Sequence, residues 1–198
     1  MISLDKTNPT RKIDLTKSER VGEIAINLNW SQGKKGLLGG LFGHHQAVDL
    51  DLGCLYELQD GQRSAIQALG NSFGDQHRAP YIALDGDDRT GESTDGEWLR
   101  INGDQWSKIK RVLVYTFIYE GAANWSSTDG TLTIHIQGQP PLQIKLEGTD
   151  DSKKFCVAAL IENEQGQIKV TRVDRYFSGH RDADHAFQWG LSWQVGHK

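Results

Sequence analysis

The side chains best suited to chemistry in this sequence are carboxylates, and six of them fall within residues 85–97. The same segment holds two threonines, one serine and three glycines, but no histidine or cysteine. Hard divalent cations such as Ca²⁺ prefer about six to eight oxygen ligands, whereas zinc and copper favour nitrogen and sulfur. The segment therefore predicts a Ca²⁺ or Mg²⁺ site. Its carboxylates are Asp85, Asp87, Asp88, Glu92, Asp95 and Glu97.

This acidic segment concentrates the negative charge of the protein. Arg89 is its only cation, so its net charge is −5 (1 − 6), while the whole chain carries −4 and the remainder +1 (−4 + 5). Carboxylates of like charge resist compaction, and a bound cation would relieve their repulsion. The alternative interpretation is a solvated acidic loop without an ion, because runs of charge are often simply hydrated.

The spacing in the acidic segment differs from that of an EF-hand. If the loop began at Asp85, Arg89 would take the place of an oxygen ligand and Thr90 that of the invariant glycine. Gly96 would stand where the bidentate glutamate belongs. We therefore expect a loop at the edge of a β-structure rather than a helix–loop–helix.

A second pair of carboxylates lies in the segment Ala47–Leu58, whose apolar residues alternate as in a half-buried strand. Asp49 and Asp51 occupy the opposite face, about 7 Å apart. We expect the acidic segment to pack against this face, which would add ligands from outside the loop.

The elements that must position these residues are strands. Alternating apolar residues, glycine-rich turns and a turn signal every 8–12 residues or so predict a mainly β protein, a β-sandwich of about ten short strands with few short helices. Residues 109–119 are apolar on both faces, as in a central strand. We expect one domain over residues 1–198, with residues 1–13 as a flexible or edge segment. The segments expected to form strands are 23–30, 47–58, 64–69, 81–84, 98–101, 109–119, 132–136, 142–146, 155–161 and 168–173, and those with weak helical character are 104–108 and 182–193.

Composition excludes several classes of protein. No apolar run approaches the roughly 20 residues that span a bilayer, and residues 1–20 lack the apolar core of a signal peptide, which predicts a cytoplasmic protein. There is no basic stripe for nucleic acid. No nucleotide-binding, serine-hydrolase or zinc-protease motif occurs, so we expect no enzymatic activity. Cys54 and Cys156 are predicted to be buried, reduced thiols.

Two signatures together resemble those of the TerD family of bacterial tellurium-resistance and stress proteins. They are V-D-L-D-L at Val48–Leu52 and G-D-D-R-T-G-E at Gly86–Glu92. Further segments are more similar to the TerA branch of this family, and the similarity runs from about Asp14 to the C-terminus. These segments are G-L-L-G-G-L-F-G, D-L-D-L-G-C-L-Y-E-L, F-I-Y-E-G-A-A-N-W and Y-F-S-G-H-R.

The resemblance implies a β-sandwich that holds Ca²⁺, often as neighbouring ions, and a cytoplasmic role in chemical stress with tellurite resistance as the phenotype. It also implies protein partners in a stress-response complex. The metal ligands that it implies are Asp49, Asp51, Asp85, Asp87, Asp88, Thr90, Gly91, Glu92, Asp95 and Glu97. The family's usual G-D-N is G-D-D here, and the glycines and acids after Glu92 are fewer than in the family, which predicts that one of two neighbouring ions binds weakly or is missing.

Three other features leave alternatives open. The apolar loop at Gly36–His45, preceded by two lysines, could touch a partner or a membrane surface or fold onto its own sandwich. The cluster of His180, Asp182, Asp184 and His185 could bind a transition metal or only cap the last segment. The functional alternatives to calcium binding are a metal-assisted or redox enzyme acting on tellurium oxyanions and an acidic scaffold that needs no ion.

Overall fold

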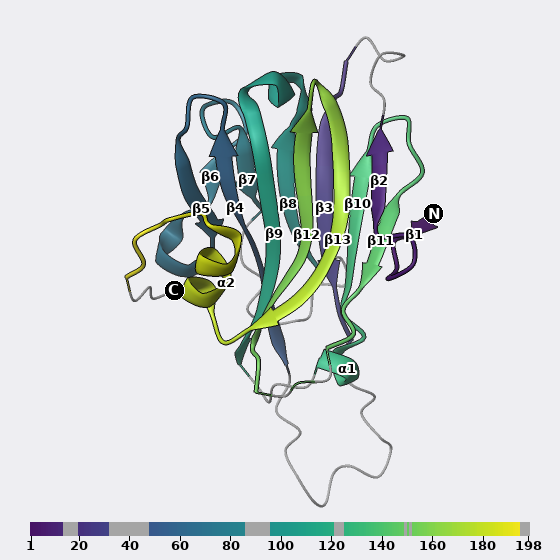
Figure 1. The fold of residues 1–198 in the computed structure, drawn as a ribbon, viewed down its shortest axis with the longest axis vertical. Helices are drawn as coiled ribbons and strands as arrows, with labels where there is room; N and C mark the ends of the chain where they lie inside the picture. The colour runs from purple at the N-terminus through teal and green to yellow at the C-terminus, as the bar shows by residue number, and fades with distance from the viewer. Residues whose placement is uncertain are drawn as a thin grey trace, which may run out of the picture.

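A computed structural model describes residues 1–13, 20–31, 48–85, 96–120, 125–148, 150 and 152–194. Two β-sheets pack face to face, as Figure 1 shows, which confirms the predicted β-sandwich. Sheet A has seven strands in the order β1-β11-β10-β3-β8-β7-β6, and sheet B has six in the order β2-β13-β12-β9-β4-β5. Among the described residues, no helix combines the length and the apolar character that a membrane crossing requires.

The strands of sheet A are β1 (Ile2–Ser3), β3 (Glu23–Asn29), β6 (Gly74–Asp75), β7 (Ile82–Leu84), β8 (Glu97–Asn102), β10 (Thr131–Ile136) and β11 (Leu142–Lys145). Those of sheet B are β2 (Thr10–Ile13), β4 (Asp49–Leu58), β5 (Arg63–Gln67), β9 (Ile109–Glu120), β12 (Phe155–Glu164) and β13 (Gln167–Phe177). The helices are α1 (Trp125–Thr128), α2 (His180–Phe187) and the 3₁₀ turns η1 (Leu69–Asn71) and η2 (Gly103–Lys108).

The described strands number thirteen, three more than the roughly ten expected. β1 and β6 have two residues each, too few for a hydrophobic period to register. β2 exposes three of its four residues and buries only Ile13, so its sequence carries no alternation, although it pairs with β13 at the edge of sheet B. The weak helical signal at residues 182–193 corresponds to α2, which begins and ends earlier.

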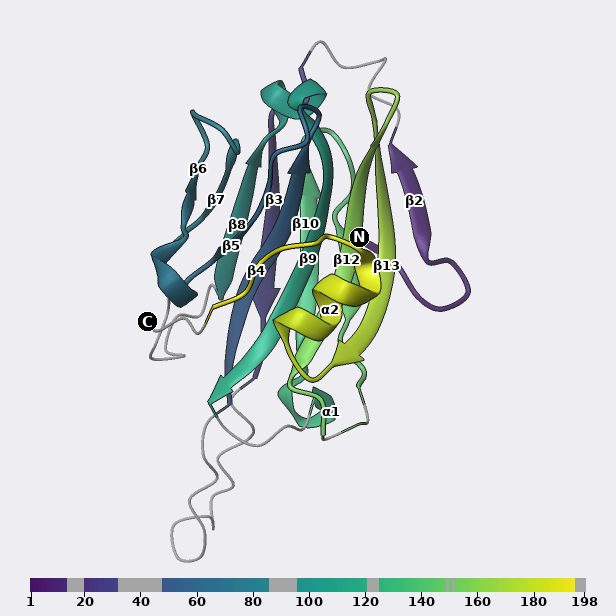
Figure 2. The same ribbon diagram turned by 60° about the vertical axis from the view of Figure 1, so that its left-hand side comes forward.

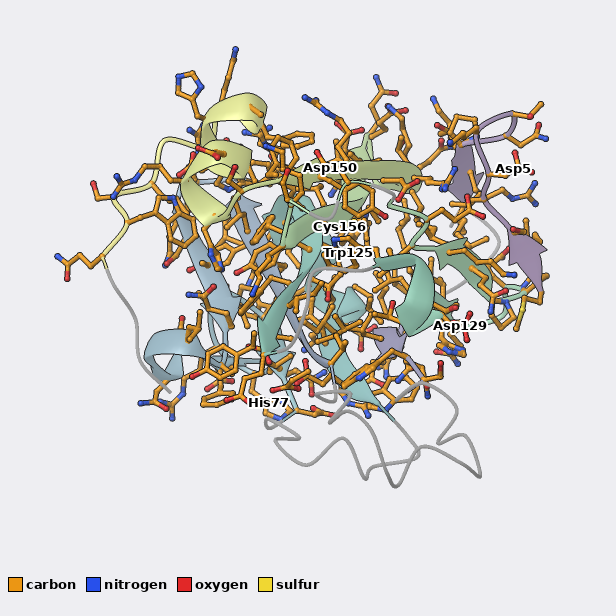
Figure 3. The ribbon with its side chains drawn as sticks, turned by 90° about the horizontal axis from the view of Figure 1, so that it is seen from below. Asp5, His77, Trp125, Asp129, Asp150 and Cys156 are labelled. Carbon is orange, nitrogen blue, oxygen red and sulfur yellow. The ribbon has the colours of Figure 1, made fainter. Side chains whose placement is uncertain are left out.

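The inner faces of the two sheets enclose the main hydrophobic core, which Leu50, Leu52 and Cys54 enter from β4. Figure 3 shows Trp125 and Cys156 in the interior of the molecule, whereas Asp5 and His77 lie at its periphery. Trp125 closes one end of the core and donates a hydrogen bond from Nε1 to the carbonyl of Lys153 at 2.7 Å.

A second hydrophobic cluster covers the outer face of sheet B. Helix α2 and the segment after it lie across this face, as Figure 2 shows, and contribute Ala183 and Trp189 to the cluster. Leu113 and Tyr115 of β9 belong to the same cluster, whereas Val112 and Val114 enter the main core. Strand β9 is therefore covered on both faces, as its continuous apolar sequence predicts.

Two glycines are needed where the chain turns. Gln165 and Gly166 both have positive φ, at 54° and 89°, which is the conformation of the two central residues in a tight hairpin between β12 and β13. Gly96 has φ of 67°, and a Cβ there would lie 2.1 Å from the carbonyl oxygen of Leu28. Only glycine fits at this position, and it places Glu97 directly at the start of β8.

Candidate metal site at one end of the sandwich

The described carboxylates of the predicted site lie at one end of the sandwich. Asp49 begins β4, Glu97 begins β8, and Asp85 directly follows β7. The antiparallel pairing of β7 with β8 brings Asp85 and Glu97 to the same end of sheet A, and the hydrogen bond between Glu97 and the backbone of Leu52 links this end to β4 in sheet B. The fold thus brings residues from distant parts of the sequence to the end of the sandwich at which the acidic segment, residues 85–97, begins and ends.

Glu97 reaches from sheet A to sheet B. Its side chain is almost fully buried, and its Oε2 accepts a hydrogen bond from the backbone N–H of Leu52 at 2.5 Å. Strand β5 pairs with β4 only from Gly53 onward, so the stretch of β4 before Gly53 has no β5 partner. The Glu97 carboxylate supplies the acceptor that a neighbouring strand would otherwise provide.

Asp49 and Asp51 share one face of β4, as the sequence predicts. Leu50 and Leu52 between and beside them enter the core, so the two aspartates lie on the outer side of sheet B. Asp51 is 1% exposed and is paired with Phe117 across the strands, while Asp49 is half-buried. The pKa of nearby Tyr115 lies well above its usual value, chiefly through burial and further through the negative charge of Asp51.

Asp85 points to a different surface. Its Oδ2 accepts a hydrogen bond from Nε of Arg100, whose Nη1 donates to Glu23 at 2.8 Å. Arg100 alternates with the core residues Leu99 and Ile101, so this ion pair lies on the outer face of sheet A. The structure therefore does not bring Asp85 onto the face of Asp49 and Asp51.

The remaining predicted ligands lie outside the described residues, and their predicted role stays a prediction. The same holds for the apolar loop at Gly36–His45. Within the described residues, no group of three or more histidine, cysteine, aspartate or glutamate side chains is placed to hold a metal ion. The predicted ligands concerned are Asp87, Asp88, Thr90, Gly91, Glu92 and Asp95.

One carboxylate near the site was missed in the sequence. Glu120, the last residue of β9, is the cross-strand partner of Asp49 and is exposed. A bulge separates this pair from the pair of Leu50 with Ile118, and such a shift cannot be read from hydrophobic periodicity. The only signal was the acidic residue at the end of a long apolar strand.

The histidine–aspartate cluster near the C-terminus does not form a metal site. The ring of His180 lies among the aromatic rings of Tyr115, Phe117, Phe155 and Trp193, with centroids 4.7–5.3 Å away. The carboxylate of Asp184 accepts hydrogen bonds from the segment that follows α2, at Gly190 N, Leu191 N and Trp193 Nε1. This finding supports the capping interpretation of the cluster.

Known proteins resemble the chain in sequence and, separately, in fold. Tellurium resistance protein TerA from an Alcaligenes species is 49% identical over 199 residues, covering all of this chain and 58% of that protein. Tellurium resistance protein TerZ from Serratia marcescens is 34% identical over 110 residues, which are 52% of this chain and 51% of TerZ. The chain thus spans little more than half the length of these curated relatives. No family model matches the sequence.

Solved structures share the fold. A homologue of telluride resistance protein (TerD) from Streptomyces coelicolor A3(2) superimposes with a TM-score of 0.56 over 83% of this chain and 95% of that chain, at 16% identity. The chain belongs to the TerD family, near the TerA proteins. A protein of unknown function superimposes with a TM-score of 0.60 over 88% of this chain and all of that chain, at 14% identity. At such identities, the likeness to these two structures concerns the TerD-type fold alone.

Proposed function

We propose that the protein is a cytoplasmic, calcium-binding, non-enzymatic protein of chemical stress response that contributes to tellurite resistance. The names of its TerA and TerZ relatives support the stress role. The metal proposal depends on the burial of two carboxylates, Asp51 and Glu97. Asp51 belongs to β4, and Glu97, the last residue of the acidic segment, contacts β4 at the adjacent Leu52.

Burying a carboxylate is costly unless donors or a cation compensate its charge. Glu97 accepts a hydrogen bond from the backbone N–H of Leu52, and the carboxylate pair Asp49–Glu120 lies at the start of the same strand, β4, and the end of β9. Carboxylate oxygens are the ligands that Ca²⁺ prefers. The oxygen chemistry therefore fits a hard divalent cation, to which Asp51 and Glu97 would add ligands beside those proposed for residues 86–95, since the described carboxylates do not form a complete metal site by themselves.

The ion would neutralise the acidic segment and order it against the end of the sandwich. A partner protein could then recognise this surface only when the metal is present, which is how we propose the protein acts. Ca²⁺ bound only to the folded state would stabilise it by about 2.7 kcal/mol at a free concentration 100-fold above the dissociation constant.

Calorimetric titration with CaCl₂ and thermal melts in CaCl₂ or EGTA test the proposal. We expect calcium to release or absorb heat with saturation and to raise the melting midpoint of the parent protein. Asp87→Ala and Asp88→Ala should weaken binding at least tenfold, whereas Asp60→Asn, in the hairpin at the other end of β4, should leave it unchanged. An ion-independent acidic scaffold predicts no calcium heat and no shift even in the parent, and that result would overturn the metal proposal.

Tellurite tolerance of a sensitive host tests the biological part separately. The parent gene should raise tolerance, and Asp87→Ala and Asp88→Ala should lower it in proportion to their loss of calcium affinity. Full tolerance with calcium-free variants would mean that the ion is not needed for the stress role.

A further inference from the structure

Three cationic side chains surround one buried carboxylate on the outer face of sheet B. Glu57 of β4 is bound by Arg63 Nη2 at 2.8 Å, by Lys110 Nζ at 2.8 Å and by Arg111 Nε at 2.6 Å. The Glu57 side chain is only 2% exposed, whereas those of Arg63 and Lys110 are 39% and 52% exposed. The carboxylate thus lies beneath the cations, which face the solvent.

The backbone explains why three cations meet at one point. Arg63, Glu57 and Arg111 are direct cross-strand partners on the neighbouring strands β5, β4 and β9. Between the pairs Glu57–Arg111 and Leu58–Ile109, β9 contains one extra residue, Lys110. A bulge of this kind re-aims side chains, and here it allows the consecutive residues Lys110 and Arg111 to reach the same carboxylate.

Trp189 holds the two arginines in place. The Arg111 guanidinium lies 3.8 Å from the centroid of the Trp189 indole, and Arg63 Nη1 donates to the Trp189 carbonyl at 3.1 Å. The indole Nε1 donates in turn to the Tyr56 carbonyl at 3.0 Å. Because Trp189 is 1% exposed, its position is set by the core, and the arginines above it are preorganised.

The cluster carries an excess of charge. Three cations against Glu57 leave a net charge of +2 (3 − 1). Glu162 of β12 is the cross-strand partner of Arg111, but its Oε2 forms an ion pair with Nζ of Lys169 at 3.1 Å. A guanidinium has five N–H donors and an ammonium three. In the described part of the chain, Arg111 uses one in a hydrogen bond, Arg63 two and Lys110 one.

We propose that Arg63, Lys110 and Arg111 form a binding site for a small, doubly charged oxyanion. An anion of charge −2 would balance the excess charge, and its oxygens match the fork of a guanidinium. Inorganic phosphate, sulfate and tellurite share this chemistry, and separate titrations distinguish them. The site lies on the face of sheet B at the end of β4 opposite Asp49, so it is independent of the proposed calcium site.

Isothermal titration of the full chain with sodium phosphate, at constant ionic strength set with NaCl, tests this proposal. We expect saturable binding at one site, and Arg63→Gln should weaken it at least fivefold. Lys12→Gln is the matched control, because Lys12 also lies on an edge strand of sheet B and also pairs with a glutamate, Glu164, at 2.6 Å. It should change the affinity less than twofold.

A spectroscopic readout locates the anion. Phosphate should shift the NMR signals of the Arg111 Nε–H and Trp189 Nε1–H groups with the same midpoint as the calorimetric titration. If circular dichroism shows that Arg63→Gln is unfolded, Lys110→Gln replaces it, since Lys110 is largely solvent-exposed.

Parallel titrations with sodium sulfate and sodium tellurite complete the test. Saturable binding of at least one of the three anions, lost in Arg63→Gln and kept in Lys12→Gln, supports the proposal and names the ligand. The absence of saturable binding for all three, or equal weakening in both variants, would overturn it.

Discussion

The carboxylate of Glu97 joins the two sheets of the sandwich by accepting a hydrogen bond from the backbone N–H of Leu52 at 2.5 Å. Glu97 begins β8 in sheet A, whereas Leu52 lies in β4 of sheet B, on the stretch that β5 does not cover. One side chain therefore has two tasks, closing a strand edge and placing a negative charge at the root of the acidic segment.

Two substitutions of Glu97 separate these tasks. Glu97→Gln keeps an oxygen acceptor for Leu52, while Glu97→Ala leaves a buried N–H unmatched, which costs about 1–3 kcal/mol. In EGTA, we expect the free energy of unfolding measured in urea to differ from that of the parent by no more than about 0.5 kcal/mol for Glu97→Gln. For Glu97→Ala, we expect it to be lower by about 1–3 kcal/mol. In CaCl₂, both should lose the calcium stabilisation. Equal stability of Glu97→Ala and the parent in EGTA would show that the Leu52 hydrogen bond is unimportant.

Strand periodicity was sufficient to predict the environment of part of the site. The alternation in β4 correctly places Asp49 and Asp51 opposite Leu50 and Leu52, because side chains of a strand alternate strictly between two faces. Sequence position alone assigns Glu97 to the acidic segment. Its role in closing the edge of β4 depends on how two sheets pack, which local patterns do not specify.

The cluster around Glu57 shows what sequence reasoning could not reach. Its four charged residues come from three strands, and their meeting depends on the register of β5, β4 and β9 and on the bulge at Lys110. Register across strands is set by turns and long-range packing. A glutamate inside a long apolar strand was the only local sign of the cluster.

Acid titration should show the contribution of Glu57 to stability. Burial raises the pKa of its carboxyl, but hydrogen bonds from Lys110, Arg111 and Arg63 outweigh this and lower the pKa from 4.5 to about 2. Between these pH values the unfolded chain binds the proton more readily than the folded chain. The contribution of Glu57 to the free energy of unfolding is therefore complete above pH 4.5 and is lost as the pH falls toward 2. Glu57→Gln should be about 1.5–3 kcal/mol less stable at pH 7 and should lose less stability in this window.

Urea midpoints measured from pH 7 to pH 2.5 check this prediction. Glu120→Gln is the control, because Glu120 is exposed at the opposite end of the same pair of strands and should follow the parent. Parallel pH profiles for the parent and Glu57→Gln would contradict the assigned role of the three hydrogen bonds.

His180 should make the docking of α2 depend on pH at a milder acidity. Burial among aromatic rings lowers the pKa of its imidazole from 6.5 to about 4. The unfolded chain therefore takes up the proton first as the pH falls. Protonation of His180 has no effect on the free energy of unfolding above pH 6.5 and lowers it as the pH drops toward 4. The loss of unfolding free energy attributable to this residue is on the order of 3 kcal/mol.

Comparison of the parent with His180→Phe isolates this effect from that of the other histidines. The phenyl ring keeps an aromatic partner for Phe155 and Trp193 but cannot be protonated. We expect hydrogen exchange in residues 180–194 to accelerate between pH 6.5 and pH 5 in the parent, after correction for the intrinsic rate, and to stay constant in the variant. The same acceleration in both proteins would rule out His180 as its cause.

The two cysteines should be chemically silent in the folded protein, which bears on the alternative of a redox enzyme. Cys54 and Cys156 are free and fully buried, and burial raises the pKa of both thiols far above the usual value. Since the thiolate is the reactive form, we expect no reaction of the native protein with a disulfide reagent over an hour and two reactive thiols in guanidinium chloride. Replacing both by alanine should leave tellurite tolerance intact, because no thiol chemistry is proposed. Loss of tolerance in a variant that still folds and binds calcium would instead favour a redox role for these residues.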